Sequence, residues 1–257
     1  MLTAPLHWAA DRLAQLGRGA RFFARLCWLA AGSVRRPRLF IDQMHFIGNY
    51  SLSIILVSGL LIGFVLGLQG YYTLRRYGSE EALGLLVTLS LVRELGPVVT
   101  ALLFAGRAGT SLTAEVGLMK AGEQIDAMEM MAVDPVSRVL APRFLAAVIC
   151  MPLLAALFSA MGVLGGYLVG VEMIGVDPGS FWSQMQGGVD WIDDVGNGVL
   201  KSIVFGFTVA FVALFVGFEA DPTPEGVARA TTTTVVVASL AVLALDFILT
   251  ALMFSAN

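Results

Sequence analysis

Residues 91–143 decide how this chain folds, and they read LVRELGPVVTALLFAGRAGTSLTAEVGLMKAGEQIDAMEMMAVDPVSRVLAPR. The block concentrates charge, glycine and proline in a chain that is 57% hydrophobic and only 14% charged. Soluble domains are roughly 45–50% apolar, so this composition indicates a membrane protein. A charged side chain at the bilayer centre costs at least about 2.5–3.5 kcal/mol, and charges that persist there need a partner or a function. We therefore expect the functional residues in this block.

Five segments around and beyond the block are long enough to cross a membrane, since a spanning helix needs roughly 20 apolar residues. They lie at about 47–74, 83–106, 144–171, 197–218 and 232–255. The sequence therefore predicts an all-α membrane protein. It consists of an N-terminal interfacial region, residues 1–40, and one five-span domain, residues 41–257.

The interfacial region alternates arginine with large apolar side chains over residues 5–31. That composition is typical of an amphipathic helix that lies in the headgroup layer, and a disordered basic tail is the alternative. No signal peptide is predicted, because no continuous apolar core precedes a small-residue cleavage site.

The distribution of charge predicts the orientation. Seven of the sixteen Lys and Arg residues precede residue 40, whereas residues 144–200 contain five carboxylates and no basic residue. The positive-inside rule then places the N-terminus in the cytoplasm and the loop at about 172–196 outside. Five spans place the C-terminus outside as well.

Four ionisable residues fall within the predicted spans. Arg93 and Glu94 are adjacent and diverge by about 100° around a helix, so they need different partners. Pro97 follows them and kinks the helix. We expect Asp246 to pair with Lys201 or Arg93, because an unpaired carboxylate would be costly there. These charges either form a functional intramembrane network or are structural pairs that hold the bundle together.

The first span carries Gly59, Gly63 and Gly67 at four-residue spacing. Small residues at that spacing let two helix backbones approach closely. The spacing does not decide whether the partner helix lies in the same chain or in a second copy.

Residues 107–143 form the longest predicted cytoplasmic segment after the N-terminus. Thr110 or Ser111 can cap a helix there, with Glu115 as a capping-box-like partner. The helix is amphipathic and rich in methionine, and Asp134-Pro135 ends it. Such a helix suits docking into a partner's groove; the alternative is a loop helix that lies on its own bundle.

Covalent chemistry is not expected from this chain. It has no G-x-x-x-x-G-K-[ST] phosphate-binding motif and no Ser-His-Asp or Cys-His set. Two cysteines and two histidines do not make a metal site or a disulfide framework. No catalytic residue, no metal and no nucleic-acid partner are predicted, so energy for transport must come from another subunit or from an ion gradient.

Residues 93–135, RELGPVVTALLFAGRAGTSLTAEVGLMKAGEQIDAMEMMAVDP, closely resemble the MlaE (YrbE-like) family of ABC-transporter permeases. The segment RATTTTVVVASLAVLALDFILTALMF at 229–254 resembles the same family, and the likeness runs from about residue 45 to the end. The resemblance implies a homodimeric permease of a bacterial inner membrane that moves phospholipid and maintains outer-membrane lipid asymmetry. Its implied partners are a cytoplasmic ABC ATPase (MlaF-like) that binds ATP and Mg, a STAS-domain subunit (MlaB-like) and a hexameric MCE-domain protein (MlaD-like).

The resemblance also implies roles for individual residues. A lipid cavity at the dimer centre would be lined by Leu66, Leu74, Tyr77 and Glu94. Residues 110–131 would form the coupling helix seated in the ATPase, with contacts from Glu115, Met119, Lys120, Glu123, Met128 and Glu129. The N-terminal helix resembles the family's interfacial elbow helix.

Two alternatives belong to other classes. A gradient-driven secondary transporter of an amphiphilic substrate would use Glu94 and Asp246 as proton sites, although no inverted repeat is visible. A membrane scaffold that only anchors other proteins would leave the charges within the spans unexplained.

Overall fold

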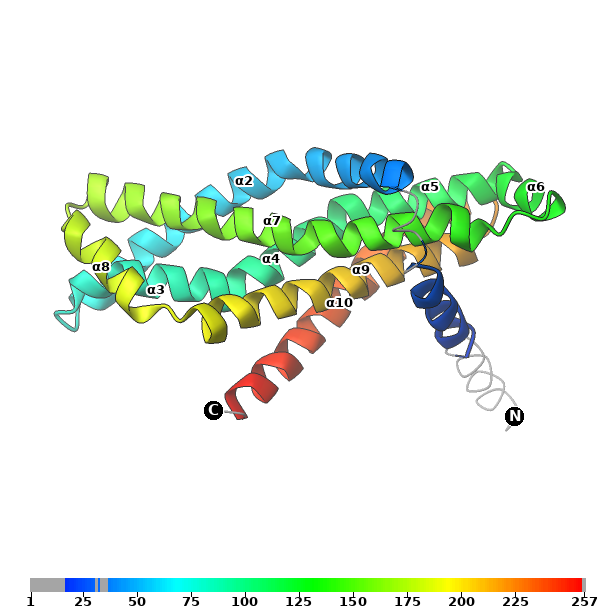
Figure 1. Cartoon of the computed structure of the whole chain (residues 1–257). Coiled ribbons are helices and arrows are strands. Elements are labelled where there is room, and N and C mark those ends of the chain that lie inside the picture. Colours follow the sequence, from blue (N-terminus) through cyan, green and yellow to red (C-terminus); the bar gives the residue numbers. More distant parts are fainter. Residues whose placement is uncertain (1–16, 31, 33–36, 256–257) are drawn as a thin grey trace, which may run out of the picture.

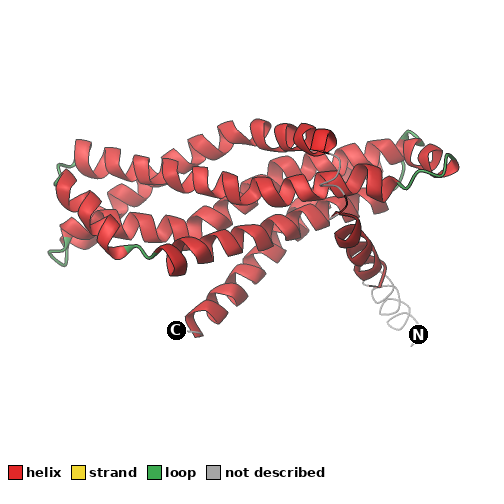
Figure 2. Ribbon diagram, viewed as in Figure 1, coloured by secondary structure: helices red, strands yellow, loops and turns green. Residues whose placement is uncertain are grey.

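The computed structural model describes residues 17–30, 32 and 37–255, and the regular elements within these residues are all helices (Figure 1, Figure 2). Five helices among them are long and apolar enough to cross a membrane. They are Arg38–Arg75 within α2 (Pro37–Arg75), Glu80–Ala121, Val136–Met173, Trp191–Glu219, and Pro224–Met253 within α10 (Pro224–Ser255). The predicted all-α fold with five spans is confirmed.

The second, third and fourth of these helices are built from α-helical pieces joined by wider π-helical turns. The α-helical pieces are α3 (Leu83–Leu89), α4 (Gly96–Phe104) and α5 (Thr110–Ala121), then α7 (Ala141–Tyr167), then α9 (Asn197–Glu219). The π-helical turns are Ser90–Leu95, Ala105–Gly109, Val136–Leu140, Leu168–Met173 and Trp191–Gly196. π-turns are rare and often mark functional sites, and two of these contain charged residues of the network described below.

The glycine-rich face of α2 packs against α7, and the two helices run side by side along the bundle (Figure 1). A Cβ atom on Gly59 would lie 2.7 Å from the Phe158 carbonyl oxygen, and one on Gly63 would overlap the backbone of Gly162. Only glycine allows this approach. The question that the spacing left open is therefore answered: the small-residue face of α2 makes a contact within one chain.

The N-terminal helix, residues 17–30, packs across α9. The ring of Phe22 lies 5.6 Å from those of Phe215 and Phe218, measured between centroids. Leu26 and Ala30 are buried, whereas the Trp28 side chain is 84% exposed. The described part of the predicted amphipathic helix is thus helical and two-sided; residues 1–16, 31 and 33–36 lie outside the described residues.

The helix expected at about 110–131 is not one helix. The second span continues without a break from Phe104 into α5, and the Thr110 hydroxyl does not cap a helix start but donates to the Gly106 carbonyl at 2.8 Å. The chain then turns at Gly122 and at Glu123, whose φ of 56° is left-handed. A second short helix, α6 (Gln124–Met130), follows. The predicted segment is therefore a helical hairpin, of which the first helix continues a span.

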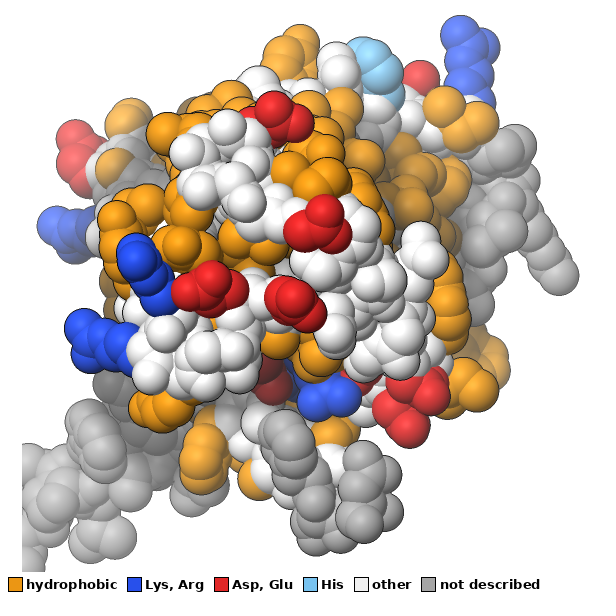
Figure 3. Space-filling model, turned by 90° about the vertical axis from the view of Figure 1, so that its left-hand side faces the viewer, with side chains coloured by type: hydrophobic (Ala, Val, Ile, Leu, Met, Phe, Trp, Pro, Cys, Tyr) orange, Lys and Arg blue, Asp and Glu red, His pale blue; other side chains and the backbone are white. Residues whose placement is uncertain are grey.

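The opposite end of the bundle carries the predicted outer loop at 172–196, which is largely helical. Asp177 caps α8 (Pro178–Gly188) by accepting a hydrogen bond from the Ser180 N–H at 2.7 Å. Figure 3 looks onto this end, where carboxylates lie among polar and apolar side chains. The exposed acidic residues here include Glu81, Glu172, Asp177, Asp190 and Asp193.

The last helix, α10, packs against α5 and α9 through its first half and diverges from the bundle toward its C-terminal end (Figure 1). Ala238 and Val242 are fully buried. On the diverging part, Leu243, Phe247 and Leu252 are exposed, Phe247 by 76%. This half of α10 contacts the bundle through Leu245 and Leu249, and through Asp246 and Thr250, which both bind Lys201.

Candidate functional site

The π-turn at Ser90–Leu95 places Arg93 and Glu94 in the middle of the second span. Gly96 and Pro97 follow directly, and Pro97 has no N–H to donate to the preceding turn. The widened turn rotates Arg93 and Glu94 toward different neighbours, as their adjacency predicted.

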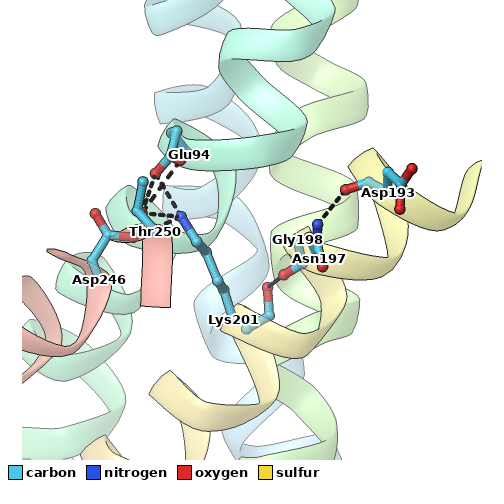
Figure 4. A network of polar contacts seen from close by, with 8 residues as sticks. Glu94, Asp193, Asn197, Gly198, Lys201, Asp246 and Thr250 are labelled. Atoms are coloured by element: carbon cyan, nitrogen blue, oxygen red, sulfur yellow. Dashed lines mark hydrogen bonds and ion pairs between the residues drawn. The ribbon is translucent and has the colours of Figure 1, made fainter. Parts of the chain in front are cut away.

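Lys201 is the centre of the site (Figure 4). Its side chain is only 2% exposed, and its ammonium nitrogen has three hydrogen bonds to donate. They go to Glu94 Oε2 at 2.7 Å, Asp246 Oδ1 at 3.1 Å and Thr250 Oγ1 at 2.7 Å. Of the two partners expected for Asp246, Lys201 and Arg93, it pairs with Lys201. One buried cation therefore links three elements: the π-turn before α4, α9 and α10.

The charges in this cluster do not balance. One ammonium faces two carboxylates, so the cluster of Glu94, Lys201 and Asp246 carries an excess negative charge when all three are ionised. Glu94 is the more accessible carboxylate, with 39% of its side chain exposed against 22% for Asp246. Its Oε1 has only a long contact of 3.4 Å with Thr250. Glu94 therefore keeps acceptor capacity for a further cation.

Arg93 does not pair with Asp246, the partner considered for it from the sequence. Its guanidinium pairs with Asp194, which is buried, and not with Asp246. Asp194 also accepts a hydrogen bond from the Asp190 N–H at 2.8 Å. In the same turn, the N–H groups of Asp193 and Ile192 bind the Asp190 carboxylate and hold its pKa below its usual value. These contacts fix the outer turn against the second span.

A small cavity of about 50 Å³ lies beside Glu94. Its lining consists of Arg93, Glu94, Asp193, Asn197, Lys201, Thr250 and Met253. Pockets for whole small molecules measure roughly 300–1,000 Å³, so within one chain this space fits a polar headgroup fragment at most. Asp194, Asn197 and Thr250 were missed by sequence reasoning. Threonine and asparagine in a span give little signal, and Asp194 lay in what read as a loop.

The other residues assigned to the cavity lie apart from Glu94 in this chain. Leu66 and Leu74 are half-buried on α2 and pack against the hydrophobic core. Tyr77 lies beyond the end of α2 and is 79% exposed. None of the three lines the cavity beside Glu94. A single chain therefore does not assemble the four residues into one site.

The residues assigned to ATPase coupling lie in different environments in the hairpin of α5 and α6: some are used within the chain and others are exposed. Glu115 pairs with Arg143 at 3.1 Å, and Lys120 donates to the Phe218 carbonyl at 2.9 Å, so both are used within the chain. Met119 and Met128 are half-buried against the core. Glu123 and Glu129 are exposed.

The exposed surface of the hairpin includes residues that were not assigned to it. Leu118, Met130 and Met131 are 58%, 84% and 68% exposed. With Glu123 and Glu129 they form what we call the hairpin face. Within the part of the chain that the structure describes, no group of three His, Cys, Asp or Glu side chains lies close enough to hold a metal ion.

The fold and site define a polytopic helical membrane protein: five helices are long and apolar enough to cross a membrane, a buried ion-pair cluster lies beside a cavity, and a helical hairpin is exposed at one end. The family described as Permease MlaE matches residues 40–252, and this chain belongs to that family.

Two curated relatives illustrate the family. The chain is 62% identical over 219 residues to the intermembrane phospholipid transport system permease protein MlaE of Haemophilus influenzae, which covers 85% of this chain and 84% of that protein. It is 36% identical over 236 residues to a probable ABC transporter permease protein of Rickettsia typhi, covering 90% of this chain and 91% of that one. The first is named as a permease of a phospholipid transport system and the second as a probable ABC transporter permease, which favours a permease over the gradient-driven transporter and the scaffold.

Proposed function

We propose that this chain is the membrane-spanning subunit of an ABC transporter that moves phospholipid between the inner membrane and a periplasmic MCE-protein route, and so maintains outer-membrane lipid asymmetry. The Haemophilus influenzae relative is named for phospholipid transport. The structural observation that carries the substrate class is Glu94, a half-exposed carboxylate inside a span, anchored by Lys201. Such a group suits the amine of a phospholipid headgroup.

The working unit in this proposal is a homodimer. The cavity beside Glu94 holds about 50 Å³, far less than a phospholipid needs, so a second copy has to complete the site. The diverging half of α10 supports this, because it exposes Leu243, Phe247 and Leu252 on the same helix that brings Thr250 and Met253 to the cavity. In the dimer, Leu66, Leu74 and Tyr77 would supply the apolar wall that a single chain does not bring to Glu94.

Energy would come from a cytoplasmic ABC ATPase that holds ATP and Mg²⁺ and carries a STAS-domain subunit. We place the ATPase at the hairpin face, Leu118, Glu123, Glu129, Met130 and Met131. Exposed methionines adapt to a partner's groove, and the two carboxylates add charge around them. The MCE protein would meet the opposite end, which carries α8.

The orientation follows from the same proposal. The chain would lie in the bacterial inner membrane, with its N-terminus in the cytoplasm and its C-terminus in the periplasm. The basic N-terminal region and the acidic end at α8 support this by the positive-inside rule.

The continuity of the second span gives the mechanism. Glu80–Ala121 is one unbroken helix, so the ATPase contact and Glu94 lie on the same rod. At about 1.5 Å per residue, Glu94 and Leu118 of the hairpin face are roughly 36 Å apart along it. Closure of the ATPases would push the two hairpins together, tilt these rods and narrow the shared cavity. Lipid then moves because the two states bind it with different affinity.

Purification of the assembled transporter tests this function. The chain is purified with the proteins encoded beside it, and phospholipid that remains bound is quantified by mass spectrometry. We expect an ATPase and bound phospholipid with the unmodified chain, and less lipid but the same subunits with Glu94→Ala. The control is Glu81→Ala, which removes an exposed carboxylate outside the site. Lipid retained equally by all three, or loss of the subunits together with lipid, would contradict the proposal.

A further inference from the structure

A second and larger apolar groove lies at the end of the bundle that carries α6. It has a volume of about 900 Å³ and runs between the N-terminal helix, the last turns of α9 and the first half of α10. Its floor is apolar, with Phe23, Phe211, Phe215 and Val237. Its rim is polar and includes Asp221 and Arg229. No residue of this groove lines the cavity beside Glu94.

The walls of the groove are held in place by specific contacts. The Phe23 ring meets Phe211 edge to face with centroids 5.2 Å apart, and Phe211 stacks on Phe215 at 5.8 Å. Arg18 pairs with Glu219 at 3.2 Å and ties the N-terminal helix to the end of α9. Gly19 and Ala20 face the groove with little or no side chain, and a Cβ on Gly19 would lie 3.7 Å from Phe215. These two residues therefore add little side-chain volume to the lining of the groove.

The rim carries one cation and one anion without partners among the described residues. Arg229, in the first turns of α10, and Asp221, in the turn before it, are both exposed, and neither forms an ion pair with another described residue. A guanidinium binds phosphate with two parallel hydrogen bonds. A carboxylate binds an ammonium group. The two together complement a zwitterionic headgroup.

We propose that this groove binds one phospholipid with an amine-bearing zwitterionic headgroup, separately from the Glu94 site. The acyl chains lie on the phenylalanine floor, the phosphate meets Arg229 and the amine meets Asp221. The order of these groups supports a lipid: the polar rim lies toward the end of the bundle and the apolar floor toward its middle, as headgroup and chains lie in a bilayer. The proposed orientation of the chain puts this end of the bundle at the cytoplasmic face, so the lipid would belong to the cytoplasmic leaflet. In that one respect the inference rests on the proposed function.

Photo-crosslinking at two neighbouring positions tests the site. Val237 lines the groove, whereas Val236 is also exposed, by 53%, but does not line it. Benzoylphenylalanine is placed at either position in the full chain, in nanodiscs with equal phosphatidylethanolamine and phosphatidylglycerol, and the adducts are identified by mass spectrometry. We expect about fivefold enrichment of phosphatidylethanolamine at position 237, the factor that one exposed ion pair of about 1 kcal/mol supplies. Adducts at position 236 should follow the bulk composition.

Charge variants assign the enrichment to the rim. Asp221→Asn should abolish it, because it removes the group that meets the amine. Arg229→Gln should lower the yield of both lipid adducts, because both lipids carry the phosphate. Arg21→Gln, an exposed arginine on the N-terminal helix that does not line the groove, should leave the enrichment and the yields unchanged. Glu94→Ala should also leave them unchanged, so failure of the proposed transport function and failure of this site give different results. Equal headgroup adducts at positions 236 and 237, or a peptide adduct from residues 1–16 or a partner protein in place of lipid, would overturn the proposal.

Discussion

The ammonium nitrogen of Lys201 lies 2.7 Å from Oε2 of Glu94, although the two residues are 107 positions apart in the chain. Asp246 approaches the same nitrogen from α10, at 3.1 Å. A buried ammonium that faces two carboxylates holds three spans together, and it also leaves negative charge at the cavity. Structure and transport therefore depend on the same cluster, and the variants below are chosen to separate them.

Removal of the cation alone should destabilise the bundle. Lys201→Met leaves Glu94 and Asp246 without a countercharge. Because their side chains are 39% and 22% exposed, we expect a cost below the roughly 3–5 kcal/mol of breaking a fully buried pair. We expect a clear fall in the thermal unfolding temperature of the purified protein. The triple variant Lys201→Met, Glu94→Gln, Asp246→Asn has no net charge in the cluster and should recover most of that loss without recovering lipid transport. A triple variant that transports normally would show that the cluster is only structural.

The close approach of α2 and α7 depends on glycine. Gly63→Ala puts a methyl group into the backbone of Gly162 and should cost about 1–3 kcal/mol, the usual range for overpacking. Gly106→Ala is the control, since no atom lies within 4 Å of its added Cβ. Thermal unfolding of both variants in the same detergent checks this. Equal unfolding temperatures would mean that the two helices do not pack as described.

The hairpin face should bind the ATPase through its exposed residues. Glu123→Arg and Met130→Glu change only exposed side chains, so we expect at least a tenfold loss of ATPase co-purification with an unchanged unfolding temperature. Glu115→Ala breaks the pair with Arg143 within the chain. It should lower stability and leave ATPase binding largely intact. Glu81→Arg, at the opposite end, serves as the control for charge reversal. Normal ATPase binding by both hairpin variants would place the contact elsewhere.

The pairing of Arg93 with Asp194 should order the turn before α9. Asp194→Ala removes the partner of Arg93 and the acceptor for the Asp190 N–H. Hydrogen exchange should therefore accelerate in residues 190–197 by about tenfold, as expected when a local opening becomes about 1.4 kcal/mol easier. Exchange in α7 should not change. Uniform acceleration across all five spans would indicate global unfolding and not a local role.

Much of the fold was predictable because the membrane imposes simple rules. Span length follows from bilayer thickness, and the pairing of Asp246 with Lys201 follows because few charges are available within the spans. Two features could not be predicted, the continuity of the second span and the pairing of Arg93 with Asp194, because the local sequence pattern fits more than one structure. The Thr110 hydroxyl suits a helix cap but equally bonds back to its own helix, so the continuity of the second span was not visible. Asp194 read as a loop carboxylate, and only the folded π-turn brings it to Arg93.

The charged residues of the candidate site could be predicted from the sequence, but the residues that would line the rest of its cavity could not. Glu94 stood out because a carboxylate in a span is costly. Leu66, Leu74 and Tyr77 were named from family resemblance, and their place beside Glu94 depends on a second chain. The position of the hairpin face in the chain was predicted. Which of its side chains are exposed depends on the helix break at Gly122 and Glu123. Met130 follows that break and is exposed, whereas Met119 precedes it and packs against the core.

The most direct test of the account is phospholipid transport by the complete transporter carrying Glu94→Gln. This variant keeps the size of the side chain and removes its charge, and Glu81→Gln is the matched control. Transfer of labelled phospholipid and ATP hydrolysis are measured on the same proteoliposomes. We expect transport to fall at least tenfold with Glu94→Gln while the assembled subunits and the ATPase contact persist, and no change with Glu81→Gln. Transport at the unmodified rate by Glu94→Gln would contradict the claim that this carboxylate acts on the lipid.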